Sequence, residues 1–188
     1  MKIYLYLKVI AIACVGALAS CATQSEITKM PMSASTRPDS SLSGKILTEV
    51  NSYRRSHGAS DLQRHAGMDL LAQQHCEYLL QHKGEFGLHG KHVSHYGFEG
   101  RAVAAREYFQ MRSVSENVVA AFNPGSNPAP VLVKLWSQSK NHDHNMRSSW
   151  THTGIGVVVA SDGTVYSTQL FGNMSNSLLS TRERFNRF

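Results

Sequence analysis

The feature that most constrains the fold is a pair of apolar segments near the C-terminal end, joined by a tight turn. Residues 154–160 and 164–171 are rich in β-branched and aromatic side chains, and Ser161-Asp162-Gly163 between them is a hairpin signal. Strands joined by so short a turn pair antiparallel. The last part of the folded chain is therefore predicted to form an antiparallel sheet.

Segments with the apolar spacing of helices precede this hairpin. Residues 43–57 are predicted to form a helix that is capped by Ser43 and ends at Gly58. Residues 66–82 and 98–109 are predicted to form two more helices. Helices followed by paired strands, without regular alternation of the two, favour an α+β layered domain over a doubly wound parallel sheet.

The region between the third helix and the hairpin combines a strand, a loop and a further helix. Residues 114–122 are apolar apart from one polar pair and are predicted to form a short buried strand. Residues 123–130 form a loop rich in proline, and Pro130, preceded by Asn127 or Ala129 as the cap, starts the next helix.

Composition limits the class of protein. The chain has 188 residues, of which 41% are hydrophobic, so one compact domain with a real core is expected. The formal charge of +6 comes from 19 Lys and Arg against 13 Asp and Glu. These basic residues are mostly scattered along the sequence, which is typical of a soluble surface, so no nucleic acid is expected as a partner.

The N-terminus is predicted to be an export signal. Within residues 1–20, Lys2 and Lys8 supply positive charge, and residues 9–18 form an apolar run that is too short to span a membrane. Leu18-Ala19-Ser20-Cys21 resembles the bacterial lipobox, in which the cysteine becomes the lipidated first residue of the mature protein. The alternative is an ordinary signal peptide with a chance cysteine.

Lipidation at Cys21 predicts the location of the protein. Acyl chains such as palmitate on this residue would hold the protein at a membrane, because two or more chains anchor stably. Ala22 follows, without an aspartate, as in lipoproteins of the outer membrane. The expected location is therefore the cell envelope, at the outer membrane, facing the periplasm or the surface.

The remaining segments and the third cysteine complete the predicted organisation. Residues 21–41 are expected to be a flexible tether, residues 42–173 the folded domain, and residues 174–188 a basic tail. Once the signal peptide is removed and Cys21 is acylated, Cys76 has no partner for an internal disulfide. A small buried side chain is favoured there over a catalytic thiol.

Polar residues able to carry chemistry lie in residues 115–145, and a further candidate, His95, lies upstream of them. Glu116 lies in an apolar strand, where a carboxylate has to be paired, hydrogen-bonded or protonated. It is either a ligand or general base, or an acceptor of backbone N–H groups, and the sequence leaves both open. With His95 and His142 it can form a site for a divalent cation such as Zn²⁺.

Other residues of this stretch are interpreted as structural supports. His142 lies just past the predicted helix end, where its imidazolium can also neutralise terminal carbonyls. Asn117 and Asn145 suit turns and backbone hydrogen bonds, and Trp136 lies at a helical core position.

A series of motifs follows in order along the folded part of the chain: Val50-Asn51 with Arg54 and Gly58, Leu62 with Leu70-Leu71-Ala72, Ser94-His95, Ser115-Glu116-Asn117, Trp136-x-x-Ser139-x-x-His142-x-x-Asn145, Gly154-x-Gly156, and Val165-Tyr166-x-x-Gln169-x-Phe171. Together they resemble the CAP superfamily, also called SCP-like, which includes cysteine-rich secretory, antigen 5 and pathogenesis-related proteins. The resemblance implies a three-layer α-β-α sandwich with a central antiparallel sheet.

The resemblance also implies a site. Many members have two histidines and two glutamates around a central cavity, and some bind a divalent cation there. By motif the histidines are His95 and His142, and one glutamate is Glu116, but the second falls at Ser139, which is grouped with the structural supports. Zn²⁺ or another divalent cation would therefore be held weakly, with water or a substrate group completing four-coordination.

Three functional hypotheses follow. The preferred one is a lipid-anchored envelope protein that acts by binding a cation, a small apolar molecule, or a cell-wall or protein partner, without catalysis. The second is a metal-assisted hydrolase in which His95, Glu116 and His142 hold a cation that activates water, or Glu116 serves as base. The third uses Ser115 or Ser139 as nucleophile, although the sequence lacks the Gly-x-Ser-x-Gly and His-Glu-x-x-His motifs.

Overall fold

The structure is a computed structural model that describes residues 40–83 and 95–174. The predicted signal peptide, nearly all of the tether and all but the first residue of the basic tail lie outside the described residues. Within the described part of the chain, no helix has the length and apolar character needed to cross a membrane.

Five helices and four strands make up the described residues, and all the helices and strands predicted above are among them, with ends shifted by a few residues. The elements in chain order are α1 (Ser40–Ser56), β1 (Gln63–Arg64), α2 (Ala66–Gln81), α3 (Phe98–Phe109), β2 (Met111–Phe122), α4 (Pro128–Ser137), α5 (Lys140–Arg147), β3 (His152–Val159) and β4 (Thr164–Met174).

Two helix starts test the capping predictions. Asn127 is the N-cap of α4, with proline in the first turn, as one of the two predicted alternatives has it. The prediction for Ser43 was wrong, because α1 begins at Ser40 and Ser43 is buried inside the helix. Its hydroxyl accepts a hydrogen bond from the Arg64 guanidinium at 2.8 Å, so tertiary packing rather than capping explains this serine.

The sheet has the strand order β1-β3-β4-β2. Strand β4 pairs antiparallel with both β2 and β3, which confirms the predicted hairpin and the α+β class. The fully antiparallel sheet that we expected needs one correction, because the two-residue β1 pairs parallel with β3. A long connection joins these two strands, so no tight turn imposes antiparallel pairing on them.

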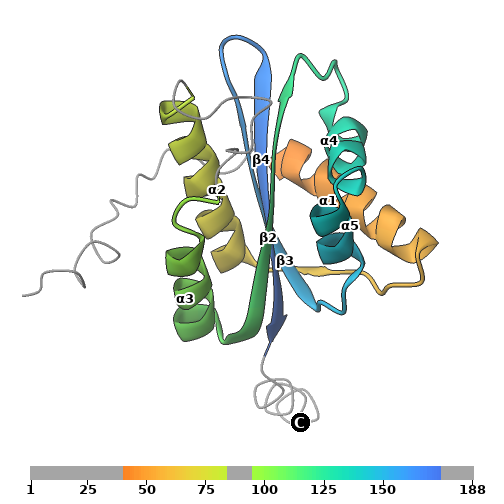
Figure 1. Cartoon of the computed structure of the whole chain (residues 1–188), viewed down its shortest axis with the longest axis vertical. Coiled ribbons are helices and arrows are strands. Elements are labelled where there is room, and N and C mark those ends of the chain that lie inside the picture. Colours follow the sequence, from red (N-terminus) through yellow and green to blue (C-terminus); the bar gives the residue numbers. More distant parts are fainter. Residues whose placement is uncertain (1–39, 84–94, 175–188) are drawn as a thin grey trace, which may run out of the picture. The chain divides into compact units, whose positions relative to one another are not determined.

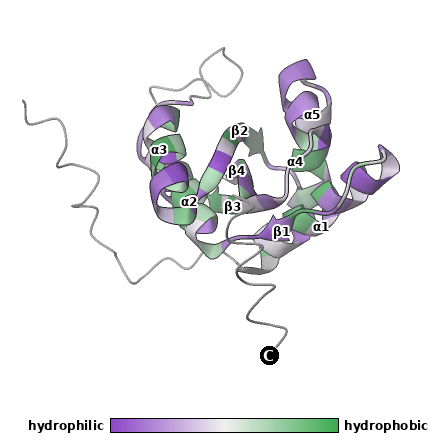
Figure 2. Cartoon of the chain, turned by 90° about the horizontal axis from the view of Figure 1, so that it is seen from below, coloured by the Kyte–Doolittle hydropathy of each residue, from purple (hydrophilic) through white to green (hydrophobic). Residues whose placement is uncertain are grey.

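Helices cover both faces of the sheet. Figures 1 and 2 show α2 and α3 against one face and α1, α4 and α5 against the other. Alternate residues of β2 face the two layers, as the pleat requires. Val118 packs with Leu79 of α2, whereas Val119 and Ala121 belong to the larger cluster built on Ile46 of α1.

Helix α5 was not predicted from the sequence. Its eight residues include one buried side chain, Met146, so the apolar periodicity that identifies a helix is missing. Figure 2 shows that α5 is mostly hydrophilic. The buried Arg54 of α1 helps to hold it, since its guanidinium donates hydrogen bonds to the carbonyls of Met146 and Ser148 beyond it.

Helix α2 satisfies the backbone of β3 with its own side chains. The Asp69 carboxylate accepts a hydrogen bond from the N–H of Ile155 at 2.8 Å, and the Gln73 amide oxygen accepts one from Val157 at 3.0 Å. Strand β3 pairs with β1 over only two residues. Beyond the end of β1, the side chains of Asp69 and Gln73 accept the hydrogen bonds of the N–H groups on this edge of β3.

This contact brings the backbones of α2 and β3 close together, and two glycines make room for it. A Cβ at Gly154 would overlap the backbone of Met68, and one at Gly156 would overlap the backbone of Ala72. Backbone atoms cannot move aside as a flexible side chain can. The Gly154-x-Gly156 motif is therefore explained by helix-to-sheet packing.

We predict that Gly154→Ala lowers the free energy of unfolding by about 2–3 kcal/mol or more, because the added methyl forces α2 away from β3. Denaturant unfolding of the variant measures this. Gly100→Ala is the matched control, because a Cβ there meets nothing within 4 Å and alanine favours the helix by about 1 kcal/mol. Equal stability of Gly154→Ala and the unmodified chain would contradict the packing argument.

Candidate functional site

The candidate site is built around Glu116, in the middle of β2. Its side chain is only 1% exposed. Val114 and Val118, two residues away on either side, pack with the clusters of the α2 and α3 layer, so the carboxylate points into that layer. A carboxylate at this depth needs partners that compensate for its lost hydration.

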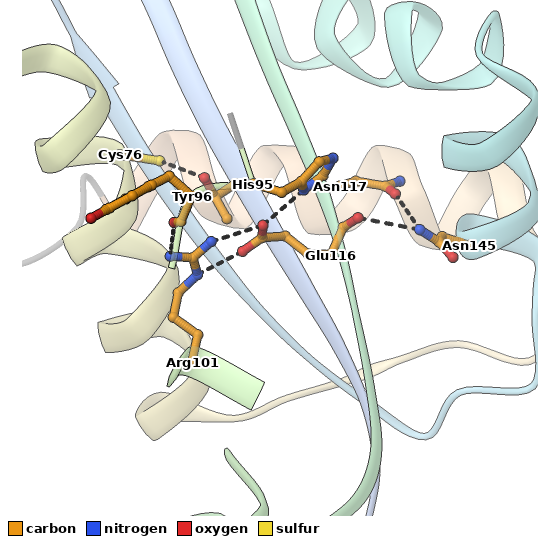
Figure 3. Close-up of polar contacts among 8 residues, drawn as sticks. Cys76, His95, Tyr96, Arg101, Glu116, Asn117 and Asn145 are labelled. Carbon is orange, nitrogen blue, oxygen red and sulfur yellow. Dashed lines mark hydrogen bonds and ion pairs between the residues drawn. The ribbon is translucent and has the colours of Figure 1, made fainter. Parts of the chain in front are cut away.

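Arg101 of α3 is the main partner of this carboxylate. Its Nε donates to Oε2 at 2.7 Å and a terminal nitrogen donates to Oε1 at 2.9 Å, which is the bidentate arrangement of a strong ion pair. The other terminal nitrogen donates to the carbonyl of Tyr96 at 2.9 Å (Figure 3). The Arg101 side chain is 12% exposed, so the ion pair is largely shielded from water.

His95 lies on the solvent side of the same carboxylate. Its Nδ1 is 2.9 Å from Oε1 of Glu116, and its side chain is 49% exposed. Burial alone would raise the pKa of Glu116, but the hydrogen bonds from His95 and Arg101 outweigh it and hold this pKa below its ordinary value. The carboxylate is therefore ionised, and Nδ1 of His95 donates the hydrogen.

His142 reaches the site from the other helical layer. It belongs to the first turn of α5, and its ring centroid lies 6.2 Å from that of His95. Burial and the nearby His95 both lower the pKa of His142, so its imidazole is neutral at pH 7. His142 does lie past the end of α4, as predicted, but the lowered pKa disfavours the imidazolium that would neutralise terminal carbonyls there.

Two asparagines connect α5 to β2. Asn145 donates from its side chain to the backbone carbonyl of Glu116 at 3.2 Å and to the Asn117 side chain at 2.9 Å. Asn117, which is fully buried, donates in turn to the carbonyl of His142 at 3.0 Å. This network, partly visible in Figure 3, fixes the backbone of both site residues, Glu116 and His142.

Other residues named from the sequence lie outside these contacts. Trp136 is fully buried in the core between α1, α4 and the sheet. Ser139 is the N-cap residue of α5, but its side chain makes no capping hydrogen bond. Cys76 is fully buried, and burial raises its pKa to about 12, so its thiol stays protonated. This confirms the small buried side chain over the catalytic thiol.

The structure thus brings together the three residues proposed from the sequence and adds a fourth. Arg101 was missed, although the sequence required some partner for Glu116. A signal for it was present, because Arg101 directly precedes Ala102 on a helix whose buried residues are all alanines, Ala102, Ala104 and Ala105. A long basic side chain beside such small residues can reach across them to the sheet.

The residues at the site do not fit a cation held by all three predicted ligands. Both oxygens of Glu116 are engaged by Arg101 and His95, and a guanidinium beside them would repel a second positive ion. Two imidazoles are left, fewer than the three protein ligands of a catalytic zinc site. Across residues 40–83 and 95–174, no group of three or more His, Cys, Asp and Glu side chains is placed to hold a metal ion.

We predict strong coupling between Glu116 and Arg101. Glu116→Gln and Arg101→Met should each lower the free energy of unfolding by about 3 kcal/mol or more, because each leaves a buried charge unpaired. The double variant should lose much less than the sum. Denaturant unfolding of the four proteins measures the coupling.

The ion pair between Arg55 and Asp61 provides the control. Its side chains are 56% and 53% exposed, so Arg55→Met should cost about 1 kcal/mol or less. Strictly additive losses for Glu116→Gln and Arg101→Met would show that the buried pair does not act as a unit.

Comparisons with known proteins agree with this geometry. The cysteine-rich secretory protein (CAP) family matches residues 47–171. No curated protein matches the chain.

Solved structures share the fold. An outer surface protein from Borrelia burgdorferi is similar with a TM-score of 0.55 and 16% identity, over 73% of this chain and 96% of that one. A cysteine-rich secretory protein from Staphylococcus aureus has a TM-score of 0.52 and 18% identity, over 71% of this chain and 39% of that one. An extracellular SCP-domain protein from Bacillus anthracis has a TM-score of 0.51 and 19% identity, over 71% and 40%. The chain therefore spans about two-fifths of the latter two proteins.

Proposed function

The chain belongs to the cysteine-rich secretory protein (CAP) family, and from this premise we propose that it is a lipid-anchored binding protein of the cell envelope. Its ligand contacts His95 and His142, and the ion pair of Glu116 and Arg101 lies deeper in the protein than His95. One observation carries the proposal: a half-exposed histidine is held by a carboxylate that is only 1% exposed.

The energetic cost of this arrangement supports a functional role. A buried ion pair is often no more stabilising than apolar residues of similar volume, so stability alone does not account for it. Perturbed titratable groups of this kind cluster at functional sites. Here the pKa values of Glu116 and His142 are both lowered. Glu116 lies in β2 and His142 lies in α5, so the fold brings them together from distant parts of the sequence.

The exposed part of the site defines what a ligand must offer. Nδ1 of His95 is committed to Glu116, so its second ring nitrogen is left to accept a hydrogen bond from a ligand. A hydroxyl or amide N–H group supplies such a donor, as found on a cell-wall fragment, a protein partner or a small molecule with an apolar body.

The envelope location rests on the N-terminal sequence. The signal segment and Cys21 predict a lipid anchor, and residues 21–41 supply a tether between the anchor and the domain. The names of the similar structures, an outer surface protein and an extracellular protein, support an address outside the cytoplasm. We propose the outer membrane, facing the periplasm or the surface.

Metal-assisted hydrolysis is the weaker proposal, because Arg101 occupies the carboxylate that a cation would need. A weakly held Zn²⁺ stays a prediction, with His95 and His142 as its remaining ligands. Among the contacts between described residues, none favours Ser115 or Ser139 as a nucleophile.

We predict that His95→Ala combined with His142→Ala reduces ligand retention about tenfold or more, because lost hydrogen bonds cost on the order of 1–3 kcal/mol. The full chain, purified from the envelope in mild detergent, is analysed by native mass spectrometry and by crosslinking. The control is His144→Ala, since His144 is exposed and next to the site in sequence. The binding role is wrong if nothing retained by the unmodified protein and the control is lost in the double variant.

We also predict that Cys21→Ser abolishes incorporation of labelled palmitate and releases the protein from the membrane fraction, because the acyl chains supply the anchor. Cys14→Ser is the control and should keep the label, because Cys14 leaves with the signal peptide. Membrane retention of labelled Cys21→Ser protein would contradict the anchor.

A further inference from the structure

We infer that Arg101 takes the place of a metal ion at Glu116, and that Arg101, Glu116 and His95 form a metal-independent acid–base site able to hydrolyse esters. The inference uses the site of the proposed function and adds an activity to it. It rests on the order of contacts from the buried guanidinium to the half-exposed imidazole (Figure 3).

Arg101 fixes the carboxylate at both oxygens. Contacts of 2.7 and 2.9 Å from two nitrogens of one planar guanidinium set the plane of the Glu116 carboxylate as well as its position. The third nitrogen is held by the carbonyl of Tyr96, so Arg101 is itself positioned by the backbone next to His95. A divalent cation would supply charge to the same carboxylate, and the guanidinium already does so.

Glu116 in turn fixes His95. A carboxylate paired with a guanidinium accepts hydrogen bonds, so in the neutral imidazole of His95 the hydrogen is on Nδ1, 2.9 Å from Glu116, and the lone pair is on Nε2. A carboxylate that holds an imidazole in this tautomer is the orienting half of the Ser-His-Asp triad. The site therefore contains an oriented base, with Glu116 and Arg101 as positioning residues.

His95 is reachable from solvent in a way that the other two groups are not. Its side chain is 49% exposed, whereas those of Glu116 and Arg101 are 1% and 12% exposed. His142, with its ring centroid 6.2 Å from that of His95, is a second imidazole beside this base, but it is more deeply buried. Water and a small ester can thus meet the basic nitrogen without entering the core.

The reaction needs no other reagent. Nε2 of His95 takes a proton from water while the water oxygen bonds to the ester carbonyl carbon. As the tetrahedral intermediate collapses, the carbon–oxygen bond to the leaving group breaks and Nε2 returns the proton to the departing alkoxide. The products are a carboxylic acid and an alcohol, and His95 ends neutral.

The test measures hydrolysis of p-nitrophenyl acetate by the full chain in detergent, with EDTA or with added Zn²⁺. We expect a rate that EDTA leaves unchanged, that His95→Gln lowers about 100-fold, and that His144→Ala leaves unchanged. His144→Ala corrects for the reactivity of any exposed imidazole. The half-exposed position of His95 makes His95→Gln compatible with folding.

A second measurement distinguishes positioning from a merely structural role, and its main reading is made on the unmodified chain. Nitrogen-15 NMR of the histidine side chains should show His95 with hydrogen on Nδ1, and Glu116→Gln, if it folds, should lose this preference. A His95 found mainly with hydrogen on Nε2 would overturn the proposal.

Two kinetic outcomes would also overturn it. Activity that EDTA removes and Zn²⁺ restores would assign the site to a metal. Equal rates for His95→Gln and the unmodified chain would show that His95 is no base. Ligand retention that depends on His95 and His142 would survive that second result, so failure of the activity is distinguishable from failure of the binding role.

Discussion

A carboxylate inside a protein has to be neutralised where it lies, and the requirement of Glu116 organises the middle of this structure. Arg101 meets it from α3 and His95 from the segment just before that helix. The ion pair therefore ties α3 and its N-terminal approach to β2. Unlike apolar contacts, which tolerate sliding, a bidentate pair fixes one register between helix and strand.

The opposite layer is positioned by hydrogen bonds to backbone. Arg54 donates to carbonyls at the end of α5 and beyond it, and Asn145 and Asn117 connect α5 with β2. On the face of the sheet that α2 and α3 cover, α2 packs closely against β3, because Gly154 has no side chain to keep the two backbones apart. Because β2 is the edge strand of the sheet, the two layers meet beside it, and His95 and His142 come together from opposite sides.

This arrangement gives the domain a polar site with a built-in cation. The family resemblance supplies two histidines and one glutamate, and Ser139 stands where a second glutamate was expected. The structure shows a guanidinium on the remaining glutamate instead. With the charge of Glu116 matched by Arg101, the exposed group of the site is the imidazole of His95, with the more buried imidazole of His142 beside it.

The sequence by itself determined the elements whose signals are local: the hairpin, the helices α2 and α3, and the need of Glu116 for a partner. It did not reveal α5, because a helix of eight residues in which only Met146 is apolar has no hydrophobic periodicity, and it did not reveal the parallel pairing of β1. Only the tertiary structure decided that Arg101 is the partner and that His142 approaches from the other layer. The physical reason is that a charge pair depends on where a helix comes to rest on a sheet, and that position is set by packing contacts between segments far apart in the chain.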